Sequence, residues 1–235
     1  MDGASAHTNA SERWTRWLSG RSQRRVPAGT RLYHEGDGPD NAHFVRAGLI
    51  KLTKHARTGP ELLIELRGPG DLVGGHSAMD GLPRFTSAAA MTESAVTTVR
   101  RAELVALVRQ DAELALAMLG DFSQDMRVTV RRLVERSTSD AVALVAARLV
   151  EFVSHPMLEP FRVVIGPTTI IDMPISQHEL ASWSGVSPRS MAIALHRLRD
   201  DGIISTSRLH VEVHDAAALV DRCNSGPCKP RTTAT

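Results

Sequence analysis

The chain has 235 residues, of which 42% are hydrophobic and 23% are charged, as in an ordinary folded protein. That length accommodates one large domain or two small ones. The formal net charge of +2 is close to neutral, so any surface that binds nucleic acid must be local. No apolar run approaches the ~20 residues of a membrane helix, and the first residues lack the apolar core of a signal peptide, so we expect a cytoplasmic protein.

Both ends of the chain are polar, and we expect residues 1–11 and 223–235 to be flexible tails. Cys223 and Cys228 lie in the second tail, where they cannot staple the fold, and the sequence leaves their role open.

Trp14, Trp17 and Leu18 recur at helical spacing and predict a short helix at the start of a first domain, residues 12–110. Short β-like runs then alternate with turn sequences from Val26 to Val99. This pattern predicts an antiparallel β-barrel of the jelly-roll type.

From Arg101 the hydrophobic period becomes helical, with a short helix over 102–109 and a long one over 111–136 that ends near Glu135. The long helix carries apolar or small residues spaced alternately three and four apart. They are Ala112, Ala115, Leu119, Phe122, Met126, Thr129 and Leu133. This seam predicts a parallel two-stranded coiled coil, although one amphipathic helix lying on its own domain would show it too. We favour the dimer because the DNA-binding pattern downstream usually reads two half-sites about one DNA turn apart.

Residues 137–140 interrupt the long helix and cap a new one over 141–153, which opens a second domain at 140–222. A β-hairpin is predicted over 162–165 and 170–173. A second hairpin, of the wing type, is predicted from the runs Ile203-Ile204 and 209–213 around a loop of Ser205 to Arg208, followed by a last short helix that Asp215 caps. The predicted class is α+β.

Between the two hairpins lies a helix-turn-helix pattern. Ser176 is a predicted N-cap with Glu179 at capping-box spacing, Gly185 supplies the turn, and Ser187 caps the second helix. An ordinary helical hairpin is the alternative. The order of caps, turn and basic second helix favours DNA binding, in which the second helix enters the major groove.

The residues expected to meet DNA lie on the first turn and the open side of that second helix, with one from the first helix. They are Gln177, Ser187, Pro188, Arg189, Ser190, Ile193, His196 and Arg197. Arg189 can contact guanine with two hydrogen bonds, worth ~1–3 kcal/mol of discrimination, whereas Ile193 can only touch a thymine methyl. The serines and Gln177 suit phosphate contacts, and Arg197 and Arg199 suit phosphate steering.

Three runs in the first domain carry a resemblance to a known family. They are Pro27-x-Gly29-x-x-Leu32-x-x-Glu35-Gly36-Asp37, Phe44-Val45-x-x-Gly48-x-x-Lys51-Leu52 and Gly70-Asp71-x-x-Gly74. With the downstream helix-turn-helix, the chain resembles the catabolite-activator/fumarate-nitrate-reductase (Crp/Fnr) family of bacterial transcription regulators from roughly Trp14 to Ala218. The resemblance implies a homodimer with a cyclic-nucleotide-binding-like sensor domain, a dimerisation helix and a winged helix-turn-helix that reads a palindromic operator. RNA polymerase is the implied further partner.

The resemblance also implies where an effector would bind. Cyclic-AMP-binding members place a glutamate on the ribose, an Arg-Ser pair on the phosphate and a Thr-Ser pair of the long helix on the base. The matching positions here, after Gly74, are Gly75, Arg84 with Phe85 and Thr86, and Thr129 with Val130. A ribose hydroxyl left without its acceptor costs about 1–3 kcal/mol. We therefore expect weak or no cyclic AMP binding, and the sequence leaves open an unidentified anion at Arg84 or a form that is competent without ligand.

Other sensing chemistries and other function classes find less support. Iron–sulfur sensing needs four thiolates, and the predicted barrel contains no cysteine. Haem-sensing members use a histidine near His76, but the companion thiolate is absent. We expect no cofactor, no metal and no enzyme activity, because no phosphate-binding loop, ligand cluster or catalytic triad motif occurs. The alternative is a module that binds a nucleotide or an anionic metabolite, with weak or vestigial DNA binding. The effector, the operator and the choice between activation and repression cannot be read from the sequence.

Overall fold

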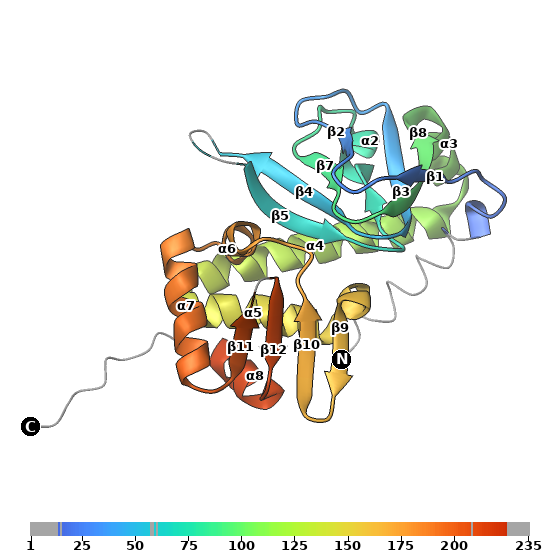
Figure 1. Cartoon of the computed structure of the whole chain (residues 1–235). Helices are drawn as coiled ribbons and strands as arrows, with labels where there is room; N and C mark the ends of the chain where they lie inside the picture. Colours follow the sequence, from blue (N-terminus) through green and yellow to red (C-terminus); the bar gives the residue numbers. More distant parts are fainter. Residues whose placement is uncertain (1–13, 15, 57–58, 60, 208, 225–235) are drawn as a thin grey trace, which may run out of the picture. The chain divides into compact units, whose positions relative to one another are not determined.

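Figure 1 shows the computed structural model, which describes residues 14, 16–56, 59, 61–207 and 209–224. The chain forms two compact units, Met1–Val130 and Arg131–Thr235. The long helix α4 (Ala112–Thr138) supplies residues to both units. In the described part of the chain, no helix is long and apolar enough to cross a membrane. The domain boundaries expected from the sequence stay predictions.

The first unit is built on two antiparallel sheets of four strands, in the orders β1-β8-β3-β6 and β2-β7-β4-β5. The strands are β1 (Arg24–Val26), β2 (Arg31–Tyr33), β3 (Asn41–Ala47), β4 (Ile50–His55), β5 (Glu61–Arg67), β6 (Leu72–Val73), β7 (Ser87–Ala90) and β8 (Ser94–Arg100). Side chains of both sheets share one core, with Val45 and Val96 from the first sheet and Ile50 and Ala88 from the second. The predicted fold class is confirmed, with two separate sheets in place of a closed barrel.

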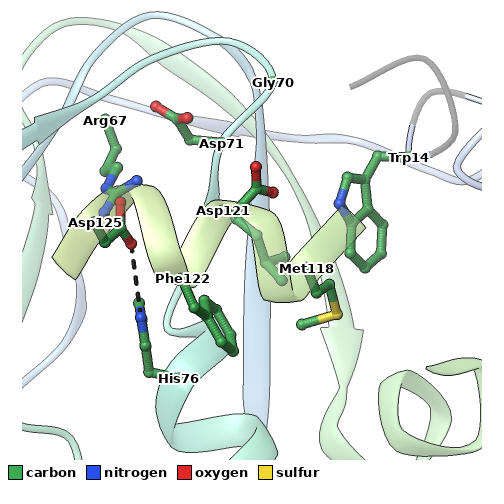
Figure 2. Close-up of a pocket in the computed structure, with 10 residues that line it drawn as sticks. Trp14, Arg67, Gly70, Asp71, His76, Met118, Asp121, Phe122 and Asp125 are labelled. Carbon is green, nitrogen blue, oxygen red and sulfur yellow. Dashed lines mark ion pairs between the residues drawn. The ribbon is translucent and has the colours of Figure 1, made fainter. Parts of the chain in front are cut away.

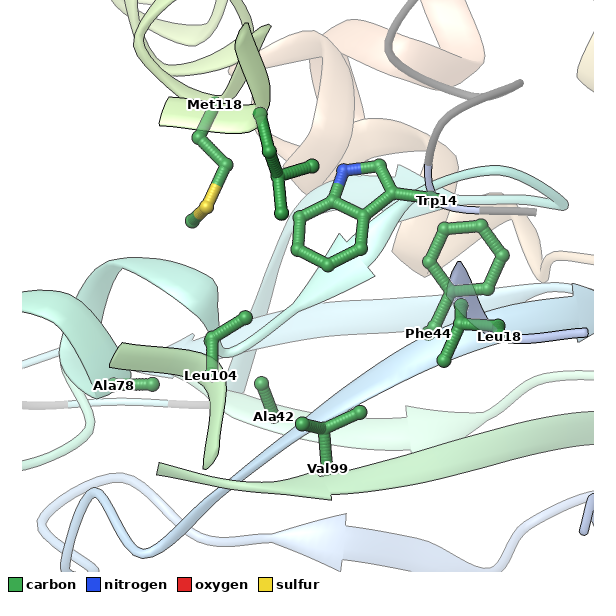
Figure 3. Close-up of a cluster of buried hydrophobic side chains, with 9 residues drawn as sticks. Trp14, Leu18, Ala42, Phe44, Ala78, Val99, Leu104 and Met118 are labelled. Carbon is green, nitrogen blue, oxygen red and sulfur yellow. The ribbon is translucent and has the colours of Figure 1, made fainter. Parts of the chain in front are cut away.

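A second core in this unit joins the first sheet to three helices, α2 (Gly75–Asp80), α3 (Arg101–Gln110) and the start of α4. Figure 3 shows Trp14 and Phe44 side by side in this core, with their ring centroids 6.1 Å apart. Leu104 of α3 and Met118 of α4 complete it. The apolar residues near the start of the chain are therefore part of the core, as their helical spacing suggested.

Helix α4 continues three residues past the predicted end near Glu135. The hydroxyls of Ser137 and Thr138 donate to the carbonyls of Leu133 and Val134, one turn back, so these residues extend the helix instead of breaking it. The helix ends at Thr138. Two residues later, the carboxylate of Asp140 accepts from the Ala143 amide and caps the next helix.

The second unit contains an antiparallel sheet of order β11-β12-β10-β9, and its helix α5 contacts helices α6, α7 and α8 and strand β10. Its elements are α5 (Ala141–Ser154), the 3₁₀ turn η1 (Pro156–Phe161), β9 (Arg162–Ile165), β10 (Thr168–Asp172), α6 (Gln177–Ser184), α7 (Pro188–Asp200), β11 (Ile204–Ser207), β12 (His210–Val213) and α8 (Ala216–Asn224). Helix α5 is the centre of the unit, since its apolar residues are buried on all sides, Val145, Leu149 and Phe152 among them.

Both predicted hairpins are present, as β9–β10 and β11–β12, and they form one sheet because β12 also pairs with β10. One prediction about this unit needs correction. The wing loop is shorter than predicted, because Ser205 to Ser207 pair with β12 as strand; Arg208 lies outside the described residues.

Helix α8 extends to Asn224 and so includes Cys223, which was expected to open the C-terminal tail. Cys223 lies in the last turn of α8 and is half-buried, and this burial raises the pKa of its thiol. Cys228 lies outside the described residues.

Candidate nucleic-acid interface and effector site

Helices α6 and α7 begin after their predicted caps, and α6 ends at the predicted turn. Ser176 and Glu179 form a reciprocal capping box, in which the Glu179 amide donates to Ser176 Oγ over 3.2 Å and the Ser176 amide donates to Glu179 Oε2 over 2.9 Å. Gly185 ends α6 in the left-handed conformation, with φ of 74°. A side chain at Gly185 would also meet the guanidinium of Arg136, which is exposed and can move aside. The positive φ of Gly185 is therefore what makes the turn require glycine.

Helix α7 divides into a buried and an open face. Met191, Ala194, Leu195 and Leu198 are buried in the second unit. Ser187 caps the helix by accepting from the Ser190 amide over 3.0 Å, and the first turn of α7 carries no acidic residue. Backbone amides at an uncompensated helix start attract anions. The open face thus presents amides, hydroxyls and basic side chains together.

The open face of α7 is exposed over its whole length. Its residues are Pro188, Arg189, Ile193, His196, Arg197 and Arg199, and Gln177 on α6 is exposed as well. His196 Nε2 lies 3.5 Å from Asp200 Oδ2, and Arg199 Nη1 donates to Thr206 Oγ1 of β11 over 2.8 Å. Arg199 therefore links α7 to the wing strand, a role that the sequence did not reveal.

Beneath the helix-turn-helix lies a buried ion network, which we call the Arg148 network: Arg132, Glu135, Arg148, Glu151 and Trp183. Arg148 of α5 is 3% exposed and binds Glu135 Oε2 over 3.1 Å and Glu151 Oε1. Arg132 Nη2 lies 3.5 Å from Glu151 Oε2, and both arginines lie over the Trp183 ring of α6. The network ties the last turns of α4 to α5 and α6 within the second unit.

In the first unit, Arg84 is a buried cation among the predicted effector residues. It is 4% exposed, donates to the carbonyls of Gly74 (2.7 Å) and Asn41, and lies over the Tyr33 ring, 4.4 Å from its centroid. Its Nε is buried and has no hydrogen-bond partner among the described residues. Burial lowers the pKa of Arg84, only partly opposed by Tyr33, Asp40 and Asp37. Within the described residues, Arg84 is thus held by neutral carbonyls and has no carboxylate bonded to it.

The positions beside Arg84 leave little room for a ribose acceptor. A Cβ at Gly75 would lie 2.8 Å from Leu72 Cδ2, so a side chain there would require Leu72 to move, and it would contact the Phe122 ring at 3.8 Å. Phe85 is exposed, and its ring meets that of His76 edge-on, with centroids 5.8 Å apart. An apolar ring thus occupies the surroundings in which a phosphate would need a donor.

A second group of residues joins β5 and α2 to α4, and we call it the sheet–helix cluster: Glu65, Arg67, His76, Phe122 and Asp125. Figure 2 shows all of them except Glu65. Arg67 Nη2 of β5 lies 2.8 Å from Asp125 Oδ2 of α4 and 2.9 Å from Glu65 Oε2. Burial alone would lower the pKa of Arg67, but the carboxylates of Glu65 and Asp125 reverse this and raise it. His76 of α2 stacks on Phe122 at 4.0 Å between centroids, and its Nε2 lies 3.6 Å from Asp125 Oδ2.

Comparison with known proteins assigns both units. Residues 23–111 match the family model of the cyclic nucleotide-binding domain, and residues 145–222 match that of the Crp-like helix-turn-helix domain. The cyclic AMP receptor protein of Thermus thermophilus is 28% identical over 198 residues, which cover 84% of this chain and 86% of that protein. The chain belongs to the Crp/Fnr family of transcription regulators.

Further proteins similar to this chain are regulators of the same family. The CRP-like cAMP-activated global transcriptional regulator of Mycobacterium tuberculosis is 25% identical over 196 residues, 83% of this chain and 85% of that protein. A solved CRP/FNR-family transcriptional regulator from Thermus thermophilus has the same fold, with a TM-score of 0.73 at 22% identity, covering 87% of this chain and 99% of the other. The chain is thus a DNA-binding transcription regulator with a cyclic-nucleotide-binding-type domain.

The structure brings together only some of the predicted effector residues of this Crp/Fnr-family regulator. Gly74 and Arg84 are in contact, and Thr86 is buried and hydrogen-bonded to Tyr33. Thr129 is exposed, and its hydroxyl donates to the Asp125 carbonyl one turn back in α4. Val130 is exposed too.

The residues of the predicted dimer seam do not all lie on one exposed face of α4. Leu119, Met126 and Leu133 are exposed, whereas Phe122 is turned onto His76 of its own unit. Phe122 therefore belongs to the packing between α2 and α4, because the helical period places it on the face of Leu114 and Met118. The apolar residues of α4 that are at least half exposed are Leu116, Leu119, Met126, Val130, Leu133 and Val134.

Sequence reasoning missed the Arg148 network and the sheet–helix cluster altogether. The i,i+3 spacing of Arg148 and Glu151 was a visible signal, but the partners on α4 and β5 come from distant parts of the chain. No spacing rule could have found them.

Proposed function

We propose that this regulator acts as a homodimer that binds a palindromic operator with α7 in the major groove, and that RNA polymerase is its further partner. The observation that carries the proposal is the open face of α7. Arg189 and the α7 amides at its start, with His196 and Arg197 further along, offer both base and phosphate contacts on one exposed surface.

The exposed apolar face of α4 supports the homodimer. The exposed face contains Leu119, Met126, Val130 and Leu133, at successive intervals of seven, four and three residues. These intervals fit the seven-residue repeat of a coiled-coil seam. Large apolar side chains aligned this way on one helix face mark an interaction surface. A second copy of the same helix buries them and sets two α7 helices at the spacing of an operator.

The sensor domain, in our proposal, has a degenerate cyclic AMP site. A glutamate at Gly75 would have to displace the Leu72 side chain, and the Phe85 side chain offers no donor where the phosphate would lie. What remains is Arg84, whose buried guanidinium lacks an anionic hydrogen-bond partner among the described residues. An anion is the one class of ligand that this site still suits.

The test of DNA binding uses the full chain and an operator selected from a random DNA pool. Arg189→Ala should relax the preference at one base position, with a loss of ~1–3 kcal/mol in discrimination. Arg197→Ala is the matched control on the same face: it should weaken all sequences alike and reduce the salt slope by about one charge. If no sequence is enriched, the chain is instead a small-molecule binding module with vestigial DNA binding.

Calorimetry tests the sensor. Cyclic AMP should bind weakly or not at all to the wild-type chain. Binding at micromolar concentration or below would overturn the degenerate site.

A further inference from the structure

The sheet–helix cluster fastens α4 to the first unit through side chains of the protein itself. Arg67 of β5 reaches Asp125 of α4, and His76 of α2 both stacks on Phe122 and approaches Asp125. Two different elements thus converge on two adjacent turns of α4 (Figure 2). Arg67 and Asp125 are mostly buried, so their attraction is less screened than that of a surface pair.

The side chains of Arg67, His76, Phe122 and Asp125 leave little free space between them. With others, including Trp14 and Met118, they line a hollow of about 30 Å³. Ligand pockets commonly measure roughly 300–1,000 Å³. A nucleotide does not fit between β5 and α4 while Arg67, Asp125 and the His76–Phe122 stack stay in place.

The cluster residues of α4 also lie next to its exposed apolar face in the sequence. Asp125 lies one residue before Met126 of the exposed apolar face, and Phe122 lies between Leu119 and Met126. The same two turns of α4 therefore carry the sheet–helix cluster on one face and the proposed dimer surface on the other. Any rotation of α4 that broke the ion pair would also turn that surface.

We propose that the sheet–helix cluster holds α4 in the arrangement that binds DNA, so that this regulator binds its operator without any ligand. Arg67 and Asp125 are the positioning residues, and the His76–Phe122 stack supports them. This inference rests on the proposed function and adds its regulation: the sensor domain keeps α4 in place with an internal ion pair, and operator binding is lost when that pair is broken.

The test measures affinity of the full chain for the selected operator by fluorescence anisotropy, with no nucleotide present. Wild-type protein should bind, and added cyclic AMP or phosphate should leave the affinity unchanged. Asp125→Asn and Arg67→Gln should each lower operator affinity by about tenfold, the scale of an allosteric coupling. Affinity for non-specific DNA should stay the same, because α7 is untouched.

Three variants keep the test specific. The conservative variant Arg67→Lys keeps a positive charge between Glu65 and Asp125 and should hold operator affinity within about threefold of wild type, whereas Arg67→Gln should not. Arg127→Gln, on the exposed side of the same turn, is the matched control and should change nothing. Phe122→Leu keeps an apolar side chain but loses the stack, and should cost a smaller, roughly threefold loss.

Hydrogen exchange separates positioning from unfolding. Amides of α4 around Asp125 should exchange faster in Asp125→Asn, while those of α5 and α7 keep their protection. The inference is overturned if wild-type binding requires a nucleotide, or if Asp125→Asn binds the operator as wild type does. Failure to enrich any operator would instead overturn the proposed function itself.

Discussion

Arg84 in the first unit and Arg148 in the second are buried to nearly the same extent, with 4% and 3% of their surface exposed, but they are neutralised differently. Arg148 bonds to two carboxylates, Glu135 and Glu151. Arg84 bonds only to backbone carbonyls and keeps a buried Nε without a partner among the described residues. A buried charge costs free energy unless an opposite charge compensates it. The second unit has completed that compensation within its own fold, and the first has left it incomplete.

The different surroundings of Arg148 and Arg84 fit the different roles of the DNA-binding unit and the sensor unit. Arg148 lies under the helix-turn-helix, where a fixed geometry of α5 and α6 keeps α7 in one position. Arg84 lies in a domain of the cyclic-nucleotide-binding type, where an uncompensated cation can serve a ligand. The four predictions below test this contrast in order of decreasing effect.

The largest effect is expected from removing the carboxylates of the Arg148 network. The double variant Glu135→Gln/Glu151→Gln leaves Arg148 buried without an anion and should lower the free energy of unfolding by about 3–5 kcal/mol. Adding Arg148→Met should recover much of that loss, because the uncompensated charge is gone. Urea denaturation followed by circular dichroism measures both. Glu93→Gln, in the exposed pair with Arg25, is the control and should change stability by less than about 1 kcal/mol.

The Arg148 network and the sheet–helix cluster also show which features could not be predicted from the sequence. The caps Ser176 and Ser187 and the turn at Gly185 were predicted and are confirmed, because each depends on residues within one or two turns of itself. Arg148 with Glu135 and Arg67 with Asp125 were not predicted, because folding, not spacing, brings these partners together.

Helix α4 shows the same limit in another form. Its apolar residues cover two faces, one with Leu114 and Met118 that packs on the first unit, and one with Leu119 and Met126 that is exposed. Phe122 fits a heptad seam by spacing, but it belongs to the first face. A pattern of threes and fours identifies an amphipathic helix without saying which apolar face meets its own domain.

The second prediction concerns His43, which shares the interior of the first unit with Arg84. Burial, followed by the positive charge of Arg84, lowers the pKa of His43 to about 4 from its ordinary 6.5. The unfolded chain therefore binds a proton at higher pH than the folded one, so stability present above pH 6.5 is lost as the pH falls toward 4. Between pH 7 and pH 5 this loss should amount to about 2 kcal/mol.

Denaturation of wild type and His43→Gln at the two pH values isolates this contribution. The variant should lose about 2 kcal/mol less than wild type over the same interval, whatever its stability at pH 7. Equal losses in the two proteins would show that His43 accepts a proton in the folded state without penalty.

The third prediction is that an anion compensates Arg84. Phosphate, compared with chloride at equal ionic strength, should raise the free energy of unfolding of wild type by about 1 kcal/mol once its concentration exceeds the dissociation constant several-fold. Arg84→Met should abolish the increase. Arg25→Met, which removes an exposed arginine of the same unit, should retain it. An increase that survives in Arg84→Met would place the anion elsewhere.

The smallest effect ties the second and third predictions together. If Arg84 is an uncompensated charge, its field must reach His43, and Arg84→Met should raise the pKa of His43. Arg24→Gln should raise it less, because the charge of Arg24 is the weaker of the two influences. Titration of the imidazole signals by NMR measures both shifts, and burial, which is the largest cause, should keep the His43 pKa below 6.5 in either variant. If Arg84→Met left the titration unchanged, the charge of Arg84 would already be compensated inside the fold, and the contrast with Arg148 would disappear.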